Sequence, residues 1–100
     1  MRETTIDQLA EALEQGAALV DVREPSEYRE GHVPGARNIP MGQLTARLDE
    51  IDRHRPVHVV CATGNRSGAM TDVLTAQGFD ASNVVGGTSA WIRSGRPIEK

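Results

Sequence analysis

The chain has 100 residues, a formal net charge of −3 and one cysteine. This length suits one domain with a single hydrophobic core, so residues 1–100 are expected to form one unit. Acidic and basic residues are interspersed, which leaves no basic stripe for nucleic acid. A single cysteine excludes an internal disulfide framework, and no apolar run approaches the roughly 18 residues of a membrane span. The expected location is the cytoplasm, a reducing compartment.

The N-terminal half alternates between helical and strand patterns. Thr5 is expected to cap a first helix, with Gln8 three residues later as in a capping box. A continuous apolar run at 17–22 predicts a strand that is buried on both faces. A short helix over 25–30 and an edge-like strand over 37–40 are expected to follow.

The same alternation continues through the C-terminal half. Apolar periodicity predicts a helix over 42–51, and a β-branched run predicts a strand over 57–60. The remaining expected elements are a helix over 67–77 that buries Met70, Val73 and Leu74, a strand over 83–85, and a helix over 88–94 that carries Trp91 as a core anchor. Strands that alternate with helices indicate an α/β fold with a small parallel sheet.

The only cysteine, Cys61, stands at the end of the apolar run 57–60, before the next helical pattern. The loop between them consists of Ala62, Thr63, Gly64, Asn65, Arg66 and Ser67. Helix N-termini present free amide groups and a positive dipole end, and these favour the charged form of a thiol, as does the arginine. Cys61 is therefore predicted to be a nucleophile held partly as thiolate. The alternative is a small buried hydrophobic residue.

The spacing between Cys61 and Arg66 limits the kind of group that the loop can bind. Four residues separate Cys61 from Arg66, whereas cysteine-dependent phosphatases place five residues between cysteine and arginine. A shorter ring of amides encloses a smaller guest, so a single sulfur atom on Cys61 fits it better than a phosphoryl group. A phosphatase or arsenate reductase is the less favoured alternative.

Asp21 is the anomaly of the first buried strand, because a buried carboxylate needs a partner. It is interpreted either as an anchor behind the Cys61 loop or as a strand-end turn residue that bonds its own backbone. Arg23 and Glu27 are expected to pair, and His32 is expected to be structural rather than a catalytic base. No metal site is expected, because the three histidines and the cysteine lack ligand spacing.

Three motifs together resemble the rhodanese family over about residues 5–98. They are Asp21-Val-Arg-Glu24 with Glu27-Tyr-Arg-Glu-Gly-His-Val-Pro-Gly-Ala36-Arg-Asn-Ile-Pro40, the loop Cys61-Ala-Thr-Gly-Asn-Arg-Ser67, and Gly86-Gly87 with Trp91. The resemblance implies five parallel strands in the order 1-5-4-2-3 with helices on both faces, the first strand being short and near residues 2–4. It also implies that the cysteine takes sulfane sulfur from a donor such as thiosulfate, holds it as a persulfide, and passes it to cyanide or a thiol. No cofactor is expected.

Two points stay open in this interpretation. Arg66 either binds the anionic part of the donor or ties the loop to a nearby carboxylate. Ala62 and Thr63 are small and uncharged, unlike the strongly cationic rhodanese loops, so a protein persulfide is an alternative to thiosulfate as donor. The chain is accordingly either a thiosulfate sulfurtransferase or a persulfide carrier that docks a protein sulfur donor.

Overall fold

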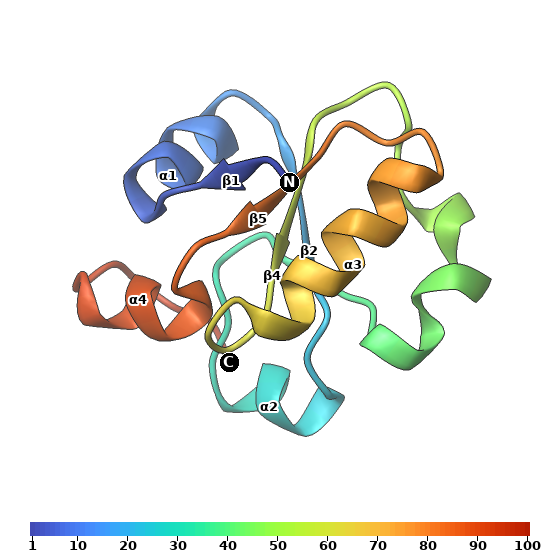
Figure 1. Cartoon of the computed structure of the whole chain (residues 1–100). Coiled ribbons are helices and arrows are strands. Elements are labelled where there is room, and N and C mark those ends of the chain that lie inside the picture. Colours follow the sequence, from blue (N-terminus) through green and yellow to red (C-terminus); the bar gives the residue numbers. More distant parts are fainter.

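A computed structural model describes residues 1–100 and contains one five-stranded parallel sheet. Its strand order is β1-β5-β4-β2-β3, so the order expected from the resemblance is confirmed. The strands are β1 (Glu3–Thr4), β2 (Ala18–Asp21), β3 (Arg37–Asn38), β4 (Val57–Val60) and β5 (Ala81–Val84). β4 lies at the centre, between β2 and β5, and its carboxyl end is the point from which the Cys61 loop departs (Figure 1).

Helices cover both faces of the sheet (Figure 1). They are α1 (Ile6–Glu14), α2 (Pro25–Glu30), α3 (Asn65–Ala76) and α4 (Gly87–Arg93), with two 3₁₀ helices, η1 (Met41–Ala46) and η2 (Leu48–Glu50). The helix α3 and η1 lie on one face, whereas α1 and α4 lie on the other. The short helix α2 lies beyond the carboxyl end of β2, close to the Cys61 loop.

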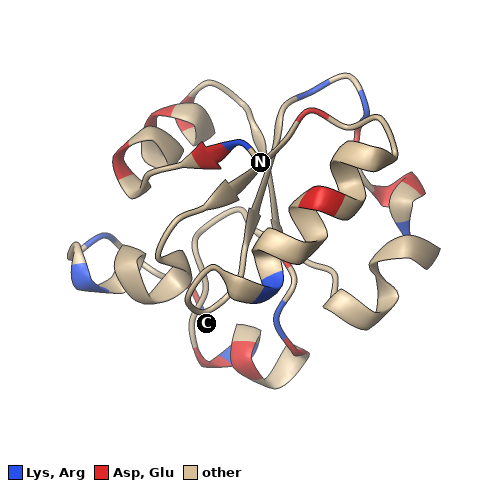
Figure 2. Cartoon of the chain, viewed as in Figure 1, with Lys and Arg blue, Asp and Glu red and all other residues tan.

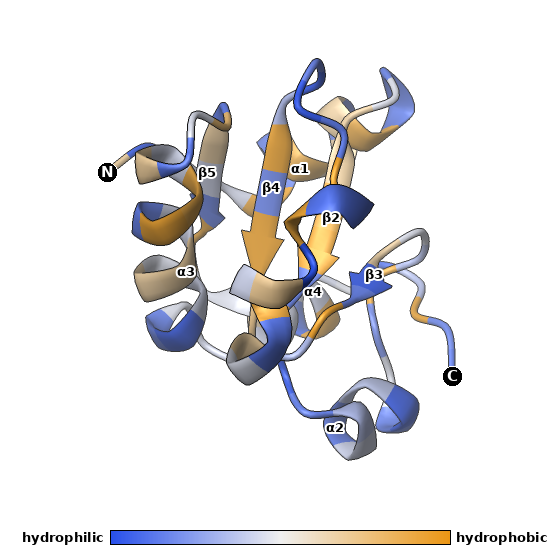
Figure 3. Cartoon of the chain, turned by 90° about the vertical axis from the view of Figure 1, so that its right-hand side faces the viewer, coloured by the Kyte–Doolittle hydropathy of each residue, from blue (hydrophilic) through white to orange (hydrophobic).

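The sheet separates two apolar clusters. The first includes Val59, Leu44 and Leu74 and fills the space under α3 and η1. The second includes Leu9 and Trp91 and fills the space under α1 and α4. Figure 3 shows β2 and β4 as mostly hydrophobic, as expected for central parallel strands that are covered on both faces.

The start of α1 has the capping box that was expected. The Thr5 hydroxyl accepts a hydrogen bond from the amide of Gln8 at 3.1 Å, and the Gln8 side chain accepts one from the amide of Thr5 at 3.0 Å. These reciprocal bonds satisfy two amide groups that have no partner inside the helix.

The predicted helix over 42–51 is wrong. The segment forms the two 3₁₀ helices η1 and η2, which meet at Arg47, where φ is −126° and the α-helical path is broken. Leu44 nevertheless enters the core and Leu48 packs against it, because the tighter 3₁₀ turns still bring these side chains to the sheet.

Other differences concern element ends and one helix face. Helix α3 begins at Asn65 rather than 67, and β5 covers Ala81–Val84 rather than 83–85. The buried positions of α3 are Ser67, Gly68, Thr71 and Leu74. Met70 and Val73, which were expected to be buried, are only partly buried. Burial of this polar face is possible because the Thr71 hydroxyl donates to the Ser67 carbonyl at 2.7 Å.

Candidate active site

Cys61 lies in a tight connection between the central strand and α3. β4 ends at Val60, and α3 begins at Asn65, so only four residues make the turn. Gly64 has φ of +112°, a backbone conformation that suits glycine and that directs the chain into the helix. The cysteine is therefore held at the carboxyl edge of the sheet, directly before the N-terminal amides of α3.

The sulfur atom of Cys61 accepts two hydrogen bonds. The amide of Gly64 lies 3.1 Å from Sγ, and the hydroxyl oxygen of Ser67 lies 3.3 Å from it. Cys61 is 1% exposed, and this burial by itself raises the pKa of the thiol. Hydrogen bonds from the Ser67 hydroxyl and from the amides of Ser67, Gly64 and Thr63 outweigh burial, so the net pKa is lowered. The geometry therefore favours a thiolate nucleophile.

Asn83 on β5 supports this arrangement and was missed by sequence reasoning. Its side-chain oxygen lies 2.6 Å from the Ser67 hydroxyl oxygen, so it shares the single hydroxyl proton with Sγ of Cys61, and its amide nitrogen donates to the Gly64 carbonyl at 3.2 Å. The two bonds link the first turn of α3 to the turn that precedes it. The available signal was a buried polar residue within a predicted strand, the same signal that drew attention to Asp21.

We expect Ser67→Ala to raise the pKa of Cys61, because it removes the only side-chain hydrogen bond to Sγ. The rate of Cys61 alkylation by iodoacetamide should fall severalfold at neutral pH, and its pH midpoint should move upward. Ser89→Ala is the matched control, since Ser89 follows the neighbouring glycine turn but its side chain has no bond to the sulfur. An unchanged midpoint in Ser67→Ala would contradict the role of this hydroxyl.

The sign of the accompanying stability effect follows from the direction of the pKa shift. The pKa of Cys61 is lowered from its ordinary value of 9.0, so the thiolate stabilises the folded chain fully above that value. The contribution disappears as the pH falls through the lower, folded-state pKa. Ser67→Ala should therefore lose this contribution mainly at alkaline pH, which urea unfolding at several pH values measures.

The glycine turn before α4 forms backbone hydrogen bonds with the Cys61 loop. Gly86 and Gly87 lead into α4, whose amides at Thr88 and Ser89 donate to the carbonyls of Cys61 at 2.9 Å and Ala62 at 3.0 Å. Gly87 has φ of +61°, and a Cβ atom there would lie 2.6 Å from both carbonyl oxygens. Glycine at position 87 is thus required for the close approach of the two backbones.

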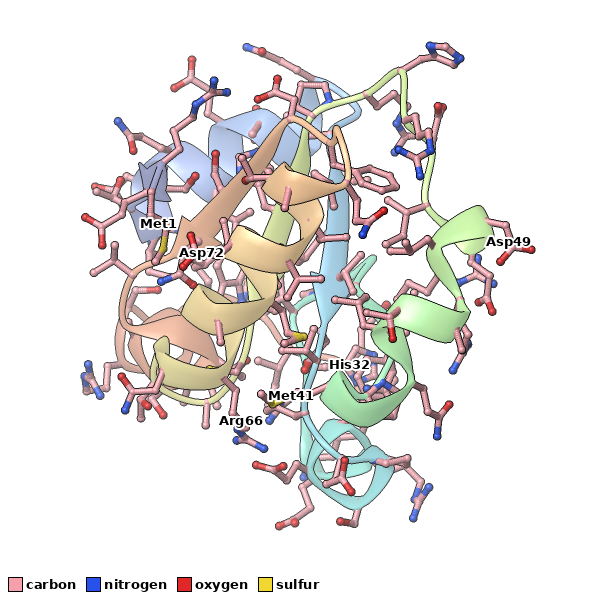
Figure 4. The ribbon with its side chains drawn as sticks, turned by 45° about the vertical axis from the view of Figure 1, so that its right-hand side comes forward. Met1, His32, Met41, Asp49, Arg66 and Asp72 are labelled. Carbon is pink, nitrogen blue, oxygen red and sulfur yellow. The ribbon has the colours of Figure 1, made fainter.

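Arg66 is bound to a carboxylate of α2. Its two terminal nitrogens donate to the two oxygens of Glu27 at 2.7 and 2.9 Å. The Arg66 hydrogen bonds lower the pKa of Glu27 to about 2, so the carboxylate is charged at all pH values above that. Glu27 raises the pKa of Arg66, to which the Cys61 thiolate also contributes, so the guanidinium lies within electrostatic reach of the sulfur. Figure 4 labels Arg66 at the start of α3, on the side toward α2.

Two roles were open for Arg66, and in the structure its side chain forms an ion pair with a carboxylate. That carboxylate is Glu27 rather than Asp21. The expected pairing of Arg23 with Glu27 is wrong, because Arg23 pairs with Asp21 at 2.8 Å. The remaining loop side chains form no hydrogen bond in the structure, Thr63 and Asn65 being exposed and Ala62 half-buried.

Asp21 bonds its own strand end. Its carboxylate accepts from the amide of Arg23 at 3.0 Å and from the guanidinium, whose other contact is the Gly31 carbonyl at 2.8 Å. This is the turn arrangement that the sequence left open. Asp21 is linked to the Cys61 loop only through the pairing of β2 with β4, where it lies opposite Val60. A role for Asp21 as an anchor of the loop stays a prediction.

His32 and His58 each form a hydrogen bond with a group other than Cys61. The ring of His32 stacks on Tyr28 at 3.7 Å and bonds the Tyr28 carbonyl at 2.8 Å, and His58 bonds the Thr4 hydroxyl at 3.0 Å. No three side chains of the metal-binding types gather at one place. None of the helices has both the length and the apolar character needed to cross a bilayer.

Comparisons with known proteins agree with this architecture. The model of the rhodanese-like domain family matches residues 5–94. The Bacillus subtilis protein YqhL, which is uncharacterised, is 43% identical over 76 residues, which cover 75% of this chain and 60% of the relative. A protein of Allochromatium vinosum that is named a sulfurtransferase is 40% identical over 81 residues, covering 80% of this chain and 76% of that protein.

A solved structure has nearly the same fold over its full length. The rhodanese-related protein of Thermoplasma volcanium superimposes with a TM-score of 0.93 at 32% identity, covering 99% of this chain and 98% of that one. The chain spans about 60% of the length of the Bacillus relative. With the family model matched from residue 5 to residue 94, the chain belongs to the rhodanese-like domain family.

Proposed function

We propose that this protein is a sulfurtransferase in which Cys61 carries sulfane sulfur between a donor and an acceptor. The observation that carries the proposal is the buried sulfur of Cys61, which accepts a hydrogen bond from the Gly64 amide and lies 3.3 Å from the Ser67 hydroxyl, whose proton it shares with Asn83. These donors stabilise negative charge on sulfur before and after transfer. Membership of the rhodanese-like domain family and the sulfurtransferase name of the Allochromatium relative support the same chemistry.

The transfer has two steps. The Cys61 thiolate attacks the outer sulfur of the donor, a bond forms between the two sulfur atoms, and the remainder of the donor leaves with the electron pair. With thiosulfate the leaving group is sulfite. A nucleophilic acceptor such as cyanide or a thiolate then attacks the outer sulfur of the persulfide, which restores the Cys61 thiolate. The chain has no second cysteine, so the acceptor is another molecule.

The alternative is a persulfide carrier that docks a protein donor and turns over free small molecules slowly. Rapid loading followed by slow discharge to cyanide would favour it. A cysteine-dependent phosphatase or arsenate reductase is less favoured, because Arg66 follows Cys61 by one residue fewer than in phosphatases and its guanidinium is bound to Glu27. We also propose that the protein is located in the cytoplasm, where the reducing environment would keep the thiol of Cys61 reduced.

Intact-mass measurement tests the proposal. The protein is incubated with thiosulfate or with cysteine persulfide, freed of small molecules and weighed, and the loaded protein is then treated with cyanide. The expected result is a gain of one sulfur atom from at least one donor, with thiocyanate formed as the mass returns to its starting value. If no donor loads the protein, the sulfurtransferase proposal is wrong and phosphate-ester hydrolysis becomes the activity to assay.

A further inference from the structure

The charges of the side chains near Cys61 sum to zero, because each cation is paired with a carboxylate. Arg66 is bound by Glu27 and Arg23 is bound by Asp21, so two cations face two carboxylates. Arg23 also lies close enough to Glu27 to help lower the pKa of that carboxylate. Figure 2 shows the positive first turn of α3 near acidic positions of α2. These four side chains, called here the charge cluster, have no net charge.

The loop supplies no further cation. Arg66 is the only charged residue between Cys61 and Ser67. A shallow hollow next to the charge cluster is lined by Arg23, Glu27, Glu30, Gly31 and Ile92, which adds the carboxylate of Glu30. A dianion that approaches Cys61 from this side therefore meets no unpaired positive charge among these residues. If Arg66 turned toward the dianion, the Glu27 carboxylate would be left unpaired beside it.

We propose that the Glu27–Arg66 ion pair makes this site select alkyl persulfides over thiosulfate as sulfur donors. The inference rests on the proposed sulfurtransferase function and names the substrate class of that site. Thiosulfate carries two negative charges close to the sulfur that is transferred, and a free cation would bind its sulfonate more strongly than the loop amides alone. An alkyl persulfide has an uncharged carbon chain at the equivalent place, so a neutral charge cluster suits it.

The geometry of access supports the same choice. Cys61 is 1% exposed, so the donor must bring its outer sulfur to a sulfur atom that the protein almost completely covers. The end of an alkyl persulfide is an unbranched chain of a methylene group and two sulfur atoms. In thiosulfate the second sulfur instead carries three oxygens, and these would have to stay hydrated or be bound next to the buried sulfur of Cys61. No free cation of the loop is available to bind them.

The transfer from a persulfide balances without an oxidant or reductant. The Cys61 thiolate attacks the outer sulfur of R–S–SH, a new sulfur–sulfur bond forms, and the old bond breaks. The products are the Cys61 persulfide, Cys–S–SH, and the thiolate R–S⁻, so the total charge stays −1. The leaving group carries one negative charge, whereas sulfite carries two, which again suits a site without a free cation.

Charge selectivity at the sulfur is tested first, with two alkylating reagents. Iodoacetate and iodoacetamide react at the same atom, and they differ in charge. Their rate ratio cancels any change in the nucleophilicity of Cys61. Glu27→Gln keeps a side-chain oxygen that can accept from the Glu24 amide and removes the charge that binds Arg66. We expect this variant to raise the iodoacetate to iodoacetamide ratio about fivefold, the size of one added attraction at contact distance in water.

Two further variants separate the ion pair from net charge. Glu30→Gln makes the same change of charge at the end of the same helix, at an exposed side chain that does not contact Arg66. Its ratio should rise clearly less than that of Glu27→Gln, because the Glu30 carboxylate lines the hollow but its removal frees no guanidinium. The double variant Glu27→Gln/Arg66→Gln should lose the gain, because the freed guanidinium is absent. A ratio that rises equally in Glu27→Gln and Glu30→Gln would overturn the inference.

Donor competition completes the test. Wild type should load faster from cysteine persulfide than from thiosulfate at equal concentration, and Glu27→Gln should raise the thiosulfate rate selectively. Persulfidated serum albumin is a protein-bound donor, so its rate distinguishes protein persulfides from small ones within the same chemistry. A wild type that prefers thiosulfate, or a preference that Glu27→Gln does not change, overturns the inference while the sulfurtransferase function stands. A wild type that no donor loads overturns both.

Discussion

Cys61→Ser is expected to abolish sulfur loading from every donor. Serine keeps the shape of the side chain and two potential hydrogen-bond partners, the Gly64 amide and the Ser67 hydroxyl. Its hydroxyl is not ionised at neutral pH and forms no persulfide, so the first step has no nucleophile. The chain has no second cysteine to replace it. The measurement is intact mass after incubation with thiosulfate or cysteine persulfide, followed by the thiocyanate assay.

The control for this variant is its folding. Cys61 belongs to the larger apolar cluster, and serine places a hydroxyl there, so urea unfolding must show that the variant is folded at the temperature of the assay. Loading that persists in a folded Cys61→Ser protein would contradict the assignment of the nucleophile. Phosphate-ester hydrolysis by wild type that disappears in the variant would instead favour the phosphatase alternative.

Gly87→Ala is expected to destabilise the fold by about 3 kcal/mol, from a left-handed backbone conformation and overpacking together. The backbone has φ of +61°, and the added Cβ would lie 2.6 Å from the carbonyl oxygens of Cys61 and Ala62. Those carbonyls cannot move easily, because they accept hydrogen bonds from Thr88 and Ser89. Urea unfolding measures the loss of stability, and iodoacetamide measures the exposure of Cys61.

Gly35→Ala is the matched control for this effect. Its φ is +86°, in the same left-handed region, but a Cβ atom there has no neighbour within 4 Å. It should lose only about 1–2 kcal/mol, the penalty for the backbone conformation. The difference between the two variants isolates the contact between the glycine turn and the Cys61 loop. Equal losses at both positions would show that this contact contributes nothing to stability.

Local patterns were enough to locate most elements of this fold. Each of these patterns depends on only a few neighbouring residues. Examples are the capping box of Thr5 and Gln8, the apolar run of β4 and the glycine before α3. Where local signals were weak, prediction failed. Leucine periodicity over 42–51 is compatible with both α-helical and 3₁₀ turns, so the pattern did not distinguish the two 3₁₀ helices of the structure from one α-helix. The strand order came from resemblance, because periodicity carries no information about which strands pair.

Partners of buried polar groups were the least predictable feature of the site. Asp21 was recognised as needing a partner, but nearness in the sequence did not decide between turn and anchor, and Arg23 proved to be bonded to it. Glu27 and Arg66 are 39 residues apart, and Ser67 and Asn83 are 16 apart. Such pairs form only when the sheet brings the carboxyl ends of separate strands to one edge.

The sequence by itself predicted Cys61 as the nucleophile, and it determined the strand-to-helix loop that carries this residue and the alternation of strands and helices, because each depends on neighbouring residues. Tertiary structure alone decided the electrostatics of the site. It placed Asn83 against Ser67, the amides of α4 against the Cys61 loop, and Glu27 against Arg66. Hydrogen bonds and ion pairs act over a few ångströms, so their partners are set by the folded chain and not by distance along it.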